Sequence, residues 1–156
     1  NGGIPQGKNE QERQTTDQRN QEWVGIVGSY LVDTYALFEW YVDGNLAYRP
    51  YFVEMEGEES YTTHLTLLEF YHGVFHDAGK SSADEMLDLV LSYLRVVPLD
   101  IKSVKDAAIF RSEGLRTKKK YSYVDSANYV VARHLRVPFL TGDEAFRDVP
   151  NVAFVK

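Results

Sequence analysis

The chain has 156 residues, 44% of them hydrophobic and 13% aromatic, which is enough for one globular domain with a substantial core. Its net charge of −6 argues against a general nucleic-acid coat protein, because phosphate binding is driven by clustered lysine and arginine. Cysteine is absent, which excludes disulfides, thiolate nucleophiles and cysteine-ligated zinc. No apolar run approaches the roughly 20 residues that cross a bilayer, and no signal segment is recognisable, so we expect a soluble, cytoplasmic protein without a membrane partner.

The composition changes abruptly near Trp23. Residues 1–22 are rich in Gln, Asn and charge, with Ile4 as their only aliphatic residue. Such a segment cannot bury an apolar face, so we expect it to be flexible or vector-derived. One folded domain is predicted for residues 23–156.

Short apolar runs alternate with helical patterns along this domain. In chain order, the sequence predicts a strand at 30–32, an aromatic helix from 34, a second aromatic helix at 45–55, a β-prone run at 60–66, helices at 66–77 and 81–95, a strand at 95–99, a helix at 101–116, a helix after Ser122, and strands at 137–140 and 151–155. Strands separated by helices favour a parallel sheet that is covered on both faces.

Two of the helices have clear amphipathic patterns. In the helix at 81–95 one stripe is formed by Met86, Leu87, Val90, Leu91 and Leu94. In the helix after Ser122 the predicted buried face consists of Val124, Ala127, Val131 and Leu135. Two helix starts have capping-box spacing, Thr66 with Glu69 and Ser122 with Asp125.

Four acidic residues stand at strand ends or helix starts, namely Asp33, Glu69, Asp125 and Asp143. Each of them, taken alone, is explained as a helix cap, because the helix dipole favours acids there. In parallel sheets, however, the functional crevice lies beyond the carboxyl ends of the strands, where all four side chains are expected. Converging carboxylates repel one another unless cations lie between them, and Mg²⁺ or Mn²⁺ is the expected ion. Two such ions can activate a water for phosphodiester hydrolysis.

Four segments carry these acids, "LVDTYAL", "LTLLEF", "YVDSANYVVA" and "FLTGDEAF". In this order and at these separations they resemble the four acidic motifs of the PIN domain family, most closely the compact VapC-type toxins. The resemblance runs from about residue 29 to 155. It implies a three-layer α/β/α sandwich with a mostly parallel five-stranded sheet, and a magnesium- or manganese-dependent endoribonuclease of a toxin–antitoxin pair.

The resemblance also assigns roles to individual residues. Asp33, Glu69, Asp125 and Asp143 match the catalytic, metal-binding quartet, and Thr34 and Thr141 match residues that support it. Relatives often have a basic residue where Gly142 stands. Glu144 follows Asp143 directly, and we expect it to serve the short helix that begins there. RNA substrate, an antitoxin protein and a second copy of the chain are the implied partners.

Basic and aromatic residues suggest where such partners bind. Residues expected to contact RNA phosphates are Arg116, Lys118, Lys119, Lys120 and Arg133, with Arg111 and Arg136 nearby in sequence. The alternative for them is a solvated surface. The aromatic helices at 34–55 are expected to present Trp40, Tyr41, Tyr48 and Tyr51 to an antitoxin helix or to a second copy.

Other functions are weighed against this one. His72 and His76 have zinc-ligand spacing, but no cysteine or intervening Glu accompanies them, so surface imidazoles are preferred. A PIN-like binding or scaffold module with little activity is the main alternative, and the intact acidic quartet argues against it. A phosphatase or receiver domain would need a second acid beside Asp33, which the sequence lacks.

Overall fold

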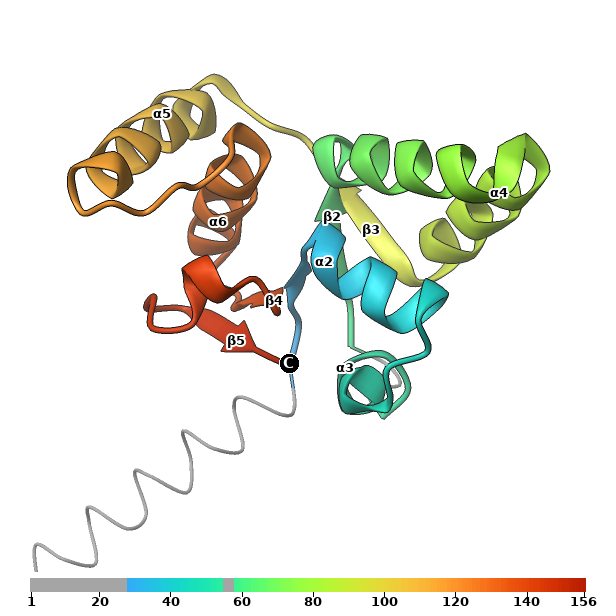
Figure 1. Ribbon diagram of the computed structural model, residues 1–156. Helices are drawn as coiled ribbons and strands as arrows, with labels where there is room; N and C mark the ends of the chain where they lie inside the picture. Colours follow the sequence, from blue (N-terminus) through green and yellow to red (C-terminus); the bar gives the residue numbers. More distant parts are fainter. Residues whose placement is uncertain (1–27, 55–57) are drawn as a thin grey trace, which may run out of the picture.

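The computed structural model describes residues 28–54 and 58–156, so the predictions for residues 1–22 and for a boundary at Trp23 lie outside the described residues. The strands are β1 (Leu31–Val32), β2 (Ser60–Thr63), β3 (Leu94–Val97), β4 (Phe139–Thr141) and β5 (Val152–Phe154). The α-helices are α2 (Thr34–Leu37), α3 (Arg49–Phe52), α4 (His64–Tyr93), α5 (Ile101–Arg116) and α6 (Tyr123–Leu135). Shorter turns are the π-helix η1 (Phe38–Val42) and the 3₁₀ helices η2 (Leu46–Tyr48) and η3 (Glu144–Phe146) (Figure 1).

The strands form one five-stranded sheet in the order β3-β2-β1-β4-β5, with every pairing parallel. Leu31 pairs with Tyr61 on one side and with Phe139 on the other, so β1 lies at the centre of the sheet. The carboxyl ends of all five strands therefore meet at one edge. This arrangement confirms the predicted α/β fold with a parallel five-stranded sheet.

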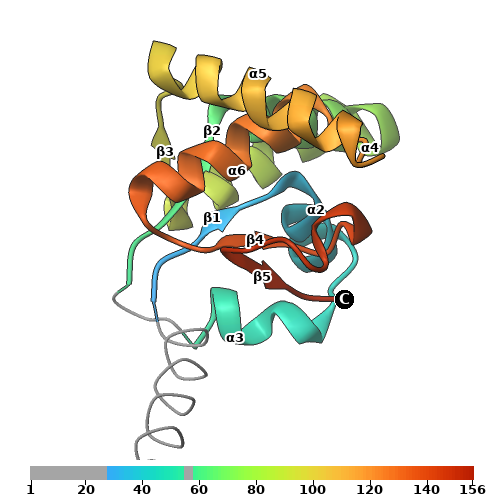
Figure 2. The same ribbon diagram turned by 90° about the vertical axis from the view of Figure 1, so that its left-hand side faces the viewer.

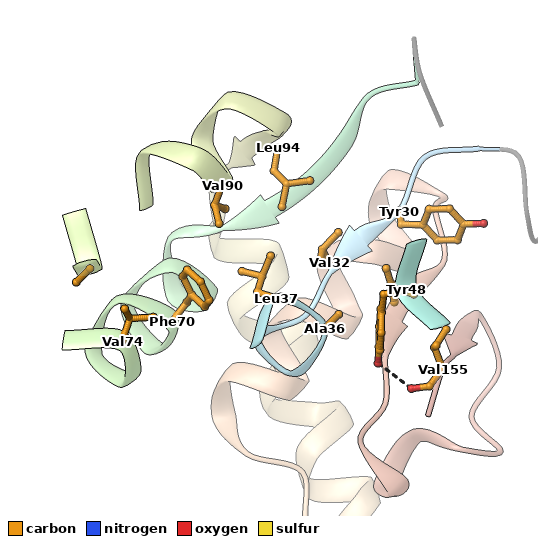
Figure 3. Packing of buried hydrophobic residues seen from close by; sticks show 12 residues of the cluster. Tyr30, Val32, Ala36, Leu37, Tyr48, Phe70, Val74, Val90, Leu94 and Val155 are labelled. Carbon is orange, nitrogen blue, oxygen red and sulfur yellow. Dashed lines mark hydrogen bonds between the residues drawn. The ribbon is translucent and has the colours of Figure 1, made fainter. Parts of the chain in front are cut away.

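Helices cover both faces of this sheet (Figure 2). Successive strand residues point to opposite faces, and Leu31 and Val32 accordingly belong to different core clusters. Val32 packs with α2, η2 and α4 side chains such as Leu37, Tyr48 and Phe70 (Figure 3). The other cluster joins Leu31 to side chains of α6, η3 and β4, and α5 packs on the outside of α6. The layers match the predicted sandwich.

Helices α5 and α6 begin where the sequence predicts. Asp100 caps α5 by accepting a hydrogen bond from the Ser103 amide at 2.8 Å. At α6 the Ser122 hydroxyl accepts from the Asp125 amide at 3.0 Å, and the Asp125 carboxylate accepts from the Ser122 amide at 2.9 Å. The predicted capping box is thus confirmed.

The capping box predicted for Thr66 and Glu69 is wrong. Helix α4 begins two residues earlier, and Thr63 is its N-cap, with its hydroxyl accepting a hydrogen bond from the Thr66 amide at 3.3 Å. Both threonines favour this position, and Thr63 occupies it because β2 ends there. The break predicted between residues 77 and 81 is present at Gly79, whose φ of 82° is the left-handed conformation that glycine tolerates.

Two predicted apolar stripes are only partly buried. Leu91 is exposed, and Leu94 belongs to β3 and not to the preceding helix, which ends at Tyr93. In α6 the side chain of Leu135, the last residue of the helix before the left-handed Arg136 (φ 58°), is exposed. The buried part of α6 is instead the continuous run 126–132.

The aromatic segment also differs from its prediction. The second helix is interrupted, because Pro50 stands in the first turn of α3 and so starts a new helix after η2; residue 55, its predicted end, lies outside the described residues. Tyr48 is fully buried, and its hydroxyl donates to the Val155 carbonyl at 2.7 Å (Figure 3). The prediction that Tyr48 faces a partner is therefore wrong. Within the described parts of the chain, no helix is both long and apolar enough to span a membrane.

Candidate active site

The four predicted acids lie toward the carboxyl edge of the sheet, three of them after inner strands and Asp125 at the start of the helix that leads into β4. Asp33 comes directly after β1, and Asp143 is the second residue after β4. Glu69 lies in the second turn of α4, which follows β2, and Asp125 lies in the first turn of α6. Since β2, β1 and β4 are neighbours in the sheet, the fold brings these positions toward one crevice.

Asp33 is the most buried of the four, with 3% of its surface exposed. Its Oδ2 accepts a hydrogen bond from the Thr141 hydroxyl at 2.7 Å. Its Oδ1 is buried and has no hydrogen-bond partner in the described structure. Although Asp33 occupies the N-cap position of α2, its side chain makes no capping hydrogen bond. Capping therefore does not account for this carboxylate.

The surroundings of Asp33 disfavour its charge. Burial is the main cause that raises its pKa, from the ordinary 3.8 to about 7, and the charges of Asp125 and Glu69 act in the same direction. The hydrogen bond from the Thr141 hydroxyl and, to a smaller extent, the backbone N–H of Thr34 oppose this shift. Glu69 and Asp125 thus both lie near enough to Asp33 for their charges to act on it.

Thr141 connects Asp33 to the fourth acid. Its hydroxyl also accepts a hydrogen bond from the Asp143 amide at 3.1 Å, and the residue is fully buried. One oxygen of Asp143 accepts from the Ala145 amide at 2.9 Å and so caps η3. The Asp143 charge contributes, after burial, to the raised pKa of Tyr121, which places the carboxylate near that ring.

The remaining two acids each use one oxygen within the protein. Glu69 Oε1 accepts a hydrogen bond from the Thr34 hydroxyl at 2.7 Å. Asp125 uses Oδ2 in the capping box of α6. The two predicted supporting residues thus contact different members of the quartet, because Thr34 holds Glu69 and Thr141 holds Asp33.

This donor set has the chemistry of a site for a hard divalent cation. All the donors are carboxylate oxygens, which Mg²⁺ and Mn²⁺ prefer. The buried, unpartnered Oδ1 of Asp33 is the atom that a cation would satisfy. Among the described residues, no three His, Asp or Glu side chains stand close enough to enclose an ion without moving. Glu69 is exposed and is tied to the rest of the protein by the Thr34 hydrogen bond, so a modest side-chain movement could bring it into such a site.

Gly142 is required by close packing. A Cβ at this position would lie 2.3 Å from the Val155 carbonyl oxygen and 2.7 Å from the Tyr48 hydroxyl. A side chain therefore cannot be added without displacing backbone. The packing therefore leaves no room at position 142 for the basic residue that the sequence resemblance would place there.

A lysine from another segment lies beside the same turn. Lys156 Nζ donates to the Gly142 carbonyl at 3.2 Å and stands 3.3 Å from a Glu144 oxygen. Glu144 is also paired with Arg147, whose Nε is 2.8 Å away, and this partner lowers the Glu144 pKa to about 2. Glu144 is thus engaged by two cations at the start of η3, which agrees with a role in the local structure.

Sequence reasoning missed a buried polar network behind the quartet. Asn128 is fully buried and accepts from the Thr63 hydroxyl at 2.6 Å. Its amide nitrogen donates to the Thr66 hydroxyl at 2.7 Å, so one residue links α6 to the beginning of α4. The only signal in the sequence was an asparagine inside the apolar run of α6, one turn after Asp125.

The predicted RNA contacts separate into two groups. Arg116, Lys118, Lys119 and Lys120 lie at or after the end of α5, and Lys119 Nζ donates to the Ala145 carbonyl at 3.2 Å, beside the Asp143 turn. Arg133 lies in the last turn of α6, roughly 12 Å along the helix axis from Asp125. The structure brings the basic loop to the acidic edge and leaves Arg133 at the opposite end of α6.

The histidine pair considered for zinc lies on the exposed side of α4. The rings of His72 and His76 are 6.5 Å apart, and His76 Nδ1 is 2.9 Å from Asp77. His76 and Asp77 are both largely exposed. The described residues provide no third ligand for a closed zinc site.

Comparisons with known proteins agree with this architecture. The family model of the PIN domain matches residues 30–152. VapBC2 from Rickettsia felis, in complex with a DNA fragment from its promoter, superposes with a TM-score of 0.68 at 18% identity, covering 80% of this chain and 95% of that one. VapC20 from Mycobacterium tuberculosis, a Sarcin-Ricin loop cleaving toxin, gives 0.66 at 18% identity, covering 81% and 99%. FitAcB from Neisseria gonorrhoeae gives 0.66 at 19% identity, covering 81% and 96%. No curated protein matches the sequence.

Proposed function

Because the chain belongs to the PIN domain family, we propose that it is a magnesium- or manganese-dependent endoribonuclease and the toxin of a toxin–antitoxin pair in the cytoplasm. The family match and the acidic edge of the sheet support a nuclease. The similarity to solved proteins of toxin–antitoxin systems supports the biological role. At 18–20% identity that similarity concerns the fold, so the proposal depends on the site itself.

The observation that carries the proposal is the state of Asp33. A carboxylate with one buried, unpartnered oxygen and with two other acids acting on it is costly to ionise, and either a proton or a bound cation removes that cost. Asp125 and Asp143 have explanations as helix caps, but Asp33 has none. A cation-binding function for the quartet accounts for Asp33 as well as for Asp125 and Asp143.

In this function Asp33, Glu69, Asp125 and Asp143 hold the metal, which supplies charge stabilisation and an activated water for phosphodiester hydrolysis. Thr141 fixes the orientation of Asp33, and its second hydrogen bond ties that orientation to the Asp143 turn. Thr34 holds Glu69. The basic residues of the loop at 116–120 have no ion pair within the described chain, so they are available for RNA phosphates at this edge.

The test is cleavage of a mixed-sequence, single-stranded RNA oligonucleotide by the full chain. Cutting is expected with Mg²⁺ or Mn²⁺ and not with EDTA, and Asp125→Asn is expected to abolish it while circular dichroism shows an intact fold. Asp88→Asn is the matched control, since Asp88 is an exposed acid on α4 with no hydrogen bond in the described structure. Undiminished cutting in EDTA would refute the proposal. RNA binding without cleavage under any of these conditions would instead favour a PIN-like binding module.

An antitoxin is the proposed protein partner. Trp40 and Tyr41 are half-buried and both pack on Phe52, with ring centroids 5.5 Å apart in each pair, while the neighbouring Val42 and Leu46 are exposed. This surface offers apolar anchors to a partner helix. Co-expression with the product of the adjacent reading frame should give a stable complex that Leu46→Asp weakens. If light scattering shows that the same substitution only splits a homodimer, the surface joins two copies of this chain.

A further inference from the structure

An exposed tyrosine and an arginine form a stack at the first turn of α6. Tyr123 is the first residue of this helix, and 75% of its surface is exposed. The guanidinium carbon of Arg111, from α5, lies 4.3 Å from the centroid of the Tyr123 ring. The arginine covers part of the ring and leaves the rest open to solvent. The ring is therefore oriented by a cation and still available to a ligand.

The charge of Arg111 is not neutralised by an acid. No carboxylate lies within salt-bridge distance of its guanidinium in the described part of the chain. Its Nε is buried and has no hydrogen-bond partner among the described residues. The stack thus presents an aromatic ring together with an uncompensated positive charge, which suits a planar ligand that belongs to a polyanion.

The stack lies at the same edge of the sheet as the acidic quartet. Helix α6 leads into β4, so its first turn stands at the carboxyl edge, and Asp125 follows Tyr123 by two residues. Residues two apart leave a helix on different sides, which places Tyr123 beside the crevice and not inside it. The basic loop at 116–120 leads from α5 toward the start of α6, and the Lys119 contact to Ala145 ties it to the Asp143 turn.

We propose that Tyr123 and Arg111 form a stacking platform for one unpaired base of single-stranded RNA, whose backbone crosses the basic loop toward the acidic residues. This inference rests on the proposed function, because it names how the substrate of that site is held. Aromatic rings and guanidinium planes are the groups on which proteins stack splayed RNA bases. Every base has a π face, so the platform positions the strand and tolerates different sequences.

The experiment measures base stacking directly and needs no catalysis. The full chain in EDTA is titrated into single-stranded 12-nucleotide RNAs that each carry one 2-aminopurine, a base whose fluorescence falls when it stacks. At one or two positions the fluorescence should fall on binding. Tyr123→Ala should remove this signal and weaken binding about 10-fold or more, whereas Tyr123→Phe should bind within about 2-fold of the unmodified chain.

Tyr93→Ala is the matched control. Tyr93 is also largely exposed, at 62%, and it ends α4 directly before β3, so it stands at the amino edge of the sheet. This control should change neither the fluorescence nor the affinity. Melting curves check that each variant is folded, which is expected because both side chains are exposed.

The salt dependence separates stacking from phosphate contacts. Lys118→Gln and Lys120→Gln should each lower the slope of log affinity against log salt by about 0.7, the value for one phosphate contact on a single strand. Tyr123→Ala should lower the affinity and leave this slope unchanged. A merely structural role for Tyr123 would not produce this pattern together with rescue by phenylalanine.

Two results would overturn the inference: no 2-aminopurine position responding to the unmodified chain, or Tyr123→Ala binding within 2-fold of it. Failure of the proposed function has a different outcome. If the chain never cleaves RNA with Mg²⁺ or Mn²⁺ but shows Tyr123-dependent stacking, the platform stands and the nuclease proposal falls. If the chain cleaves RNA and Tyr123→Ala has no effect, only the platform is refuted.

Discussion

Replacing Asp33 by asparagine is expected to stabilise the metal-free protein at pH 8 and to remove its response to divalent metal. Burial, with the charges of Asp125 and Glu69, raises the Asp33 pKa to about 7. At pH 8 the folded protein must nevertheless ionise this buried group, at a cost that the unfolded chain does not have. An amide of the same shape keeps an acceptor for the Thr141 hydroxyl and carries no charge.

The size of the effect follows from the two pKa values. A folded-state pKa of about 7 against an ordinary 3.8 corresponds to about 4 kcal/mol at 1.36 kcal/mol for each pKa unit. This is an upper limit, because the new amide also buries an N–H group that needs an acceptor. Half of this stabilisation, about 2 kcal/mol, would raise the melting temperature by on the order of 5 °C or more for a domain of this size.

The dependence on pH has a definite sign. A carboxyl group whose pKa is raised in the folded state binds its proton more tightly there than in the unfolded chain. Its ionisation therefore destabilises the protein progressively between pH 4 and about 7, fully above that range, and not at all below it. The melting-temperature difference between Asp33→Asn and the unmodified chain should grow from pH 5 to 7 and then level off.

Melting curves from pH 5 to 8 in EDTA measure this difference, with Asp88→Asn as a surface control. Mg²⁺ or Mn²⁺ at 100 times its dissociation constant should then stabilise the unmodified chain at pH 8 by about 2.7 kcal/mol and leave Asp33→Asn unmoved. A difference that stays constant across this pH range would refute the raised pKa. If neither ion shifts the melting curve of the unmodified chain, the acids form no metal site.

Four further substitutions test the quartet and its surroundings. Gly142→Ala should destabilise the protein by about 1–3 kcal/mol in denaturant unfolding, because its Cβ would stand 2.3 Å from a backbone oxygen; an unchanged midpoint would contradict the packing. Glu144→Gln should keep RNA cleavage, since Glu144 is paired with Arg147, whereas Asp143→Asn should lose it; equal losses would show that both acids belong to the site. Asn128→Leu should cost about 2 kcal/mol or more, because it leaves two buried threonine hydroxyls without their partner.

The sequence predicts the fold well where local and tertiary signals agree. Helix α5 has the predicted bounds, and α6 begins at the predicted capping box of Ser122 and Asp125. The alternation of short strands with helices predicts the parallel sheet, and the carboxyl edge of that sheet then locates Asp33 and Asp143. These inferences need only periodicity, capping chemistry and the rule for parallel sheets.

Features that depend on distant contacts were not predictable. Tyr48 is buried because the Val155 carbonyl, 107 residues away, accepts its hydroxyl hydrogen bond. Lys156 supplies a cation beside Gly142 only because β5 runs parallel to β4 and ends at the same edge. Thr63 and Thr66 are equally good N-cap residues by type, and Thr63 caps α4 because β2 ends at that residue. No local pattern contains this information.

The same carboxylate can cap a helix and bind a metal at this site. This double capacity explains why a single acid in the sequence does not distinguish a helix cap from a metal ligand. A carboxylate has two oxygens, and both Asp125 and Asp143 give one of them to a backbone amide at a helix start. Capping stabilises the fold and at the same time fixes the second oxygen. Asp33 makes no capping hydrogen bond that would stabilise the fold in this way. Its position requires a hydrogen-bond acceptor for Thr141 but not a charge. An asparagine would supply the same acceptor for Thr141 without a charge, so Asp33 is the acid whose charge needs a functional reason.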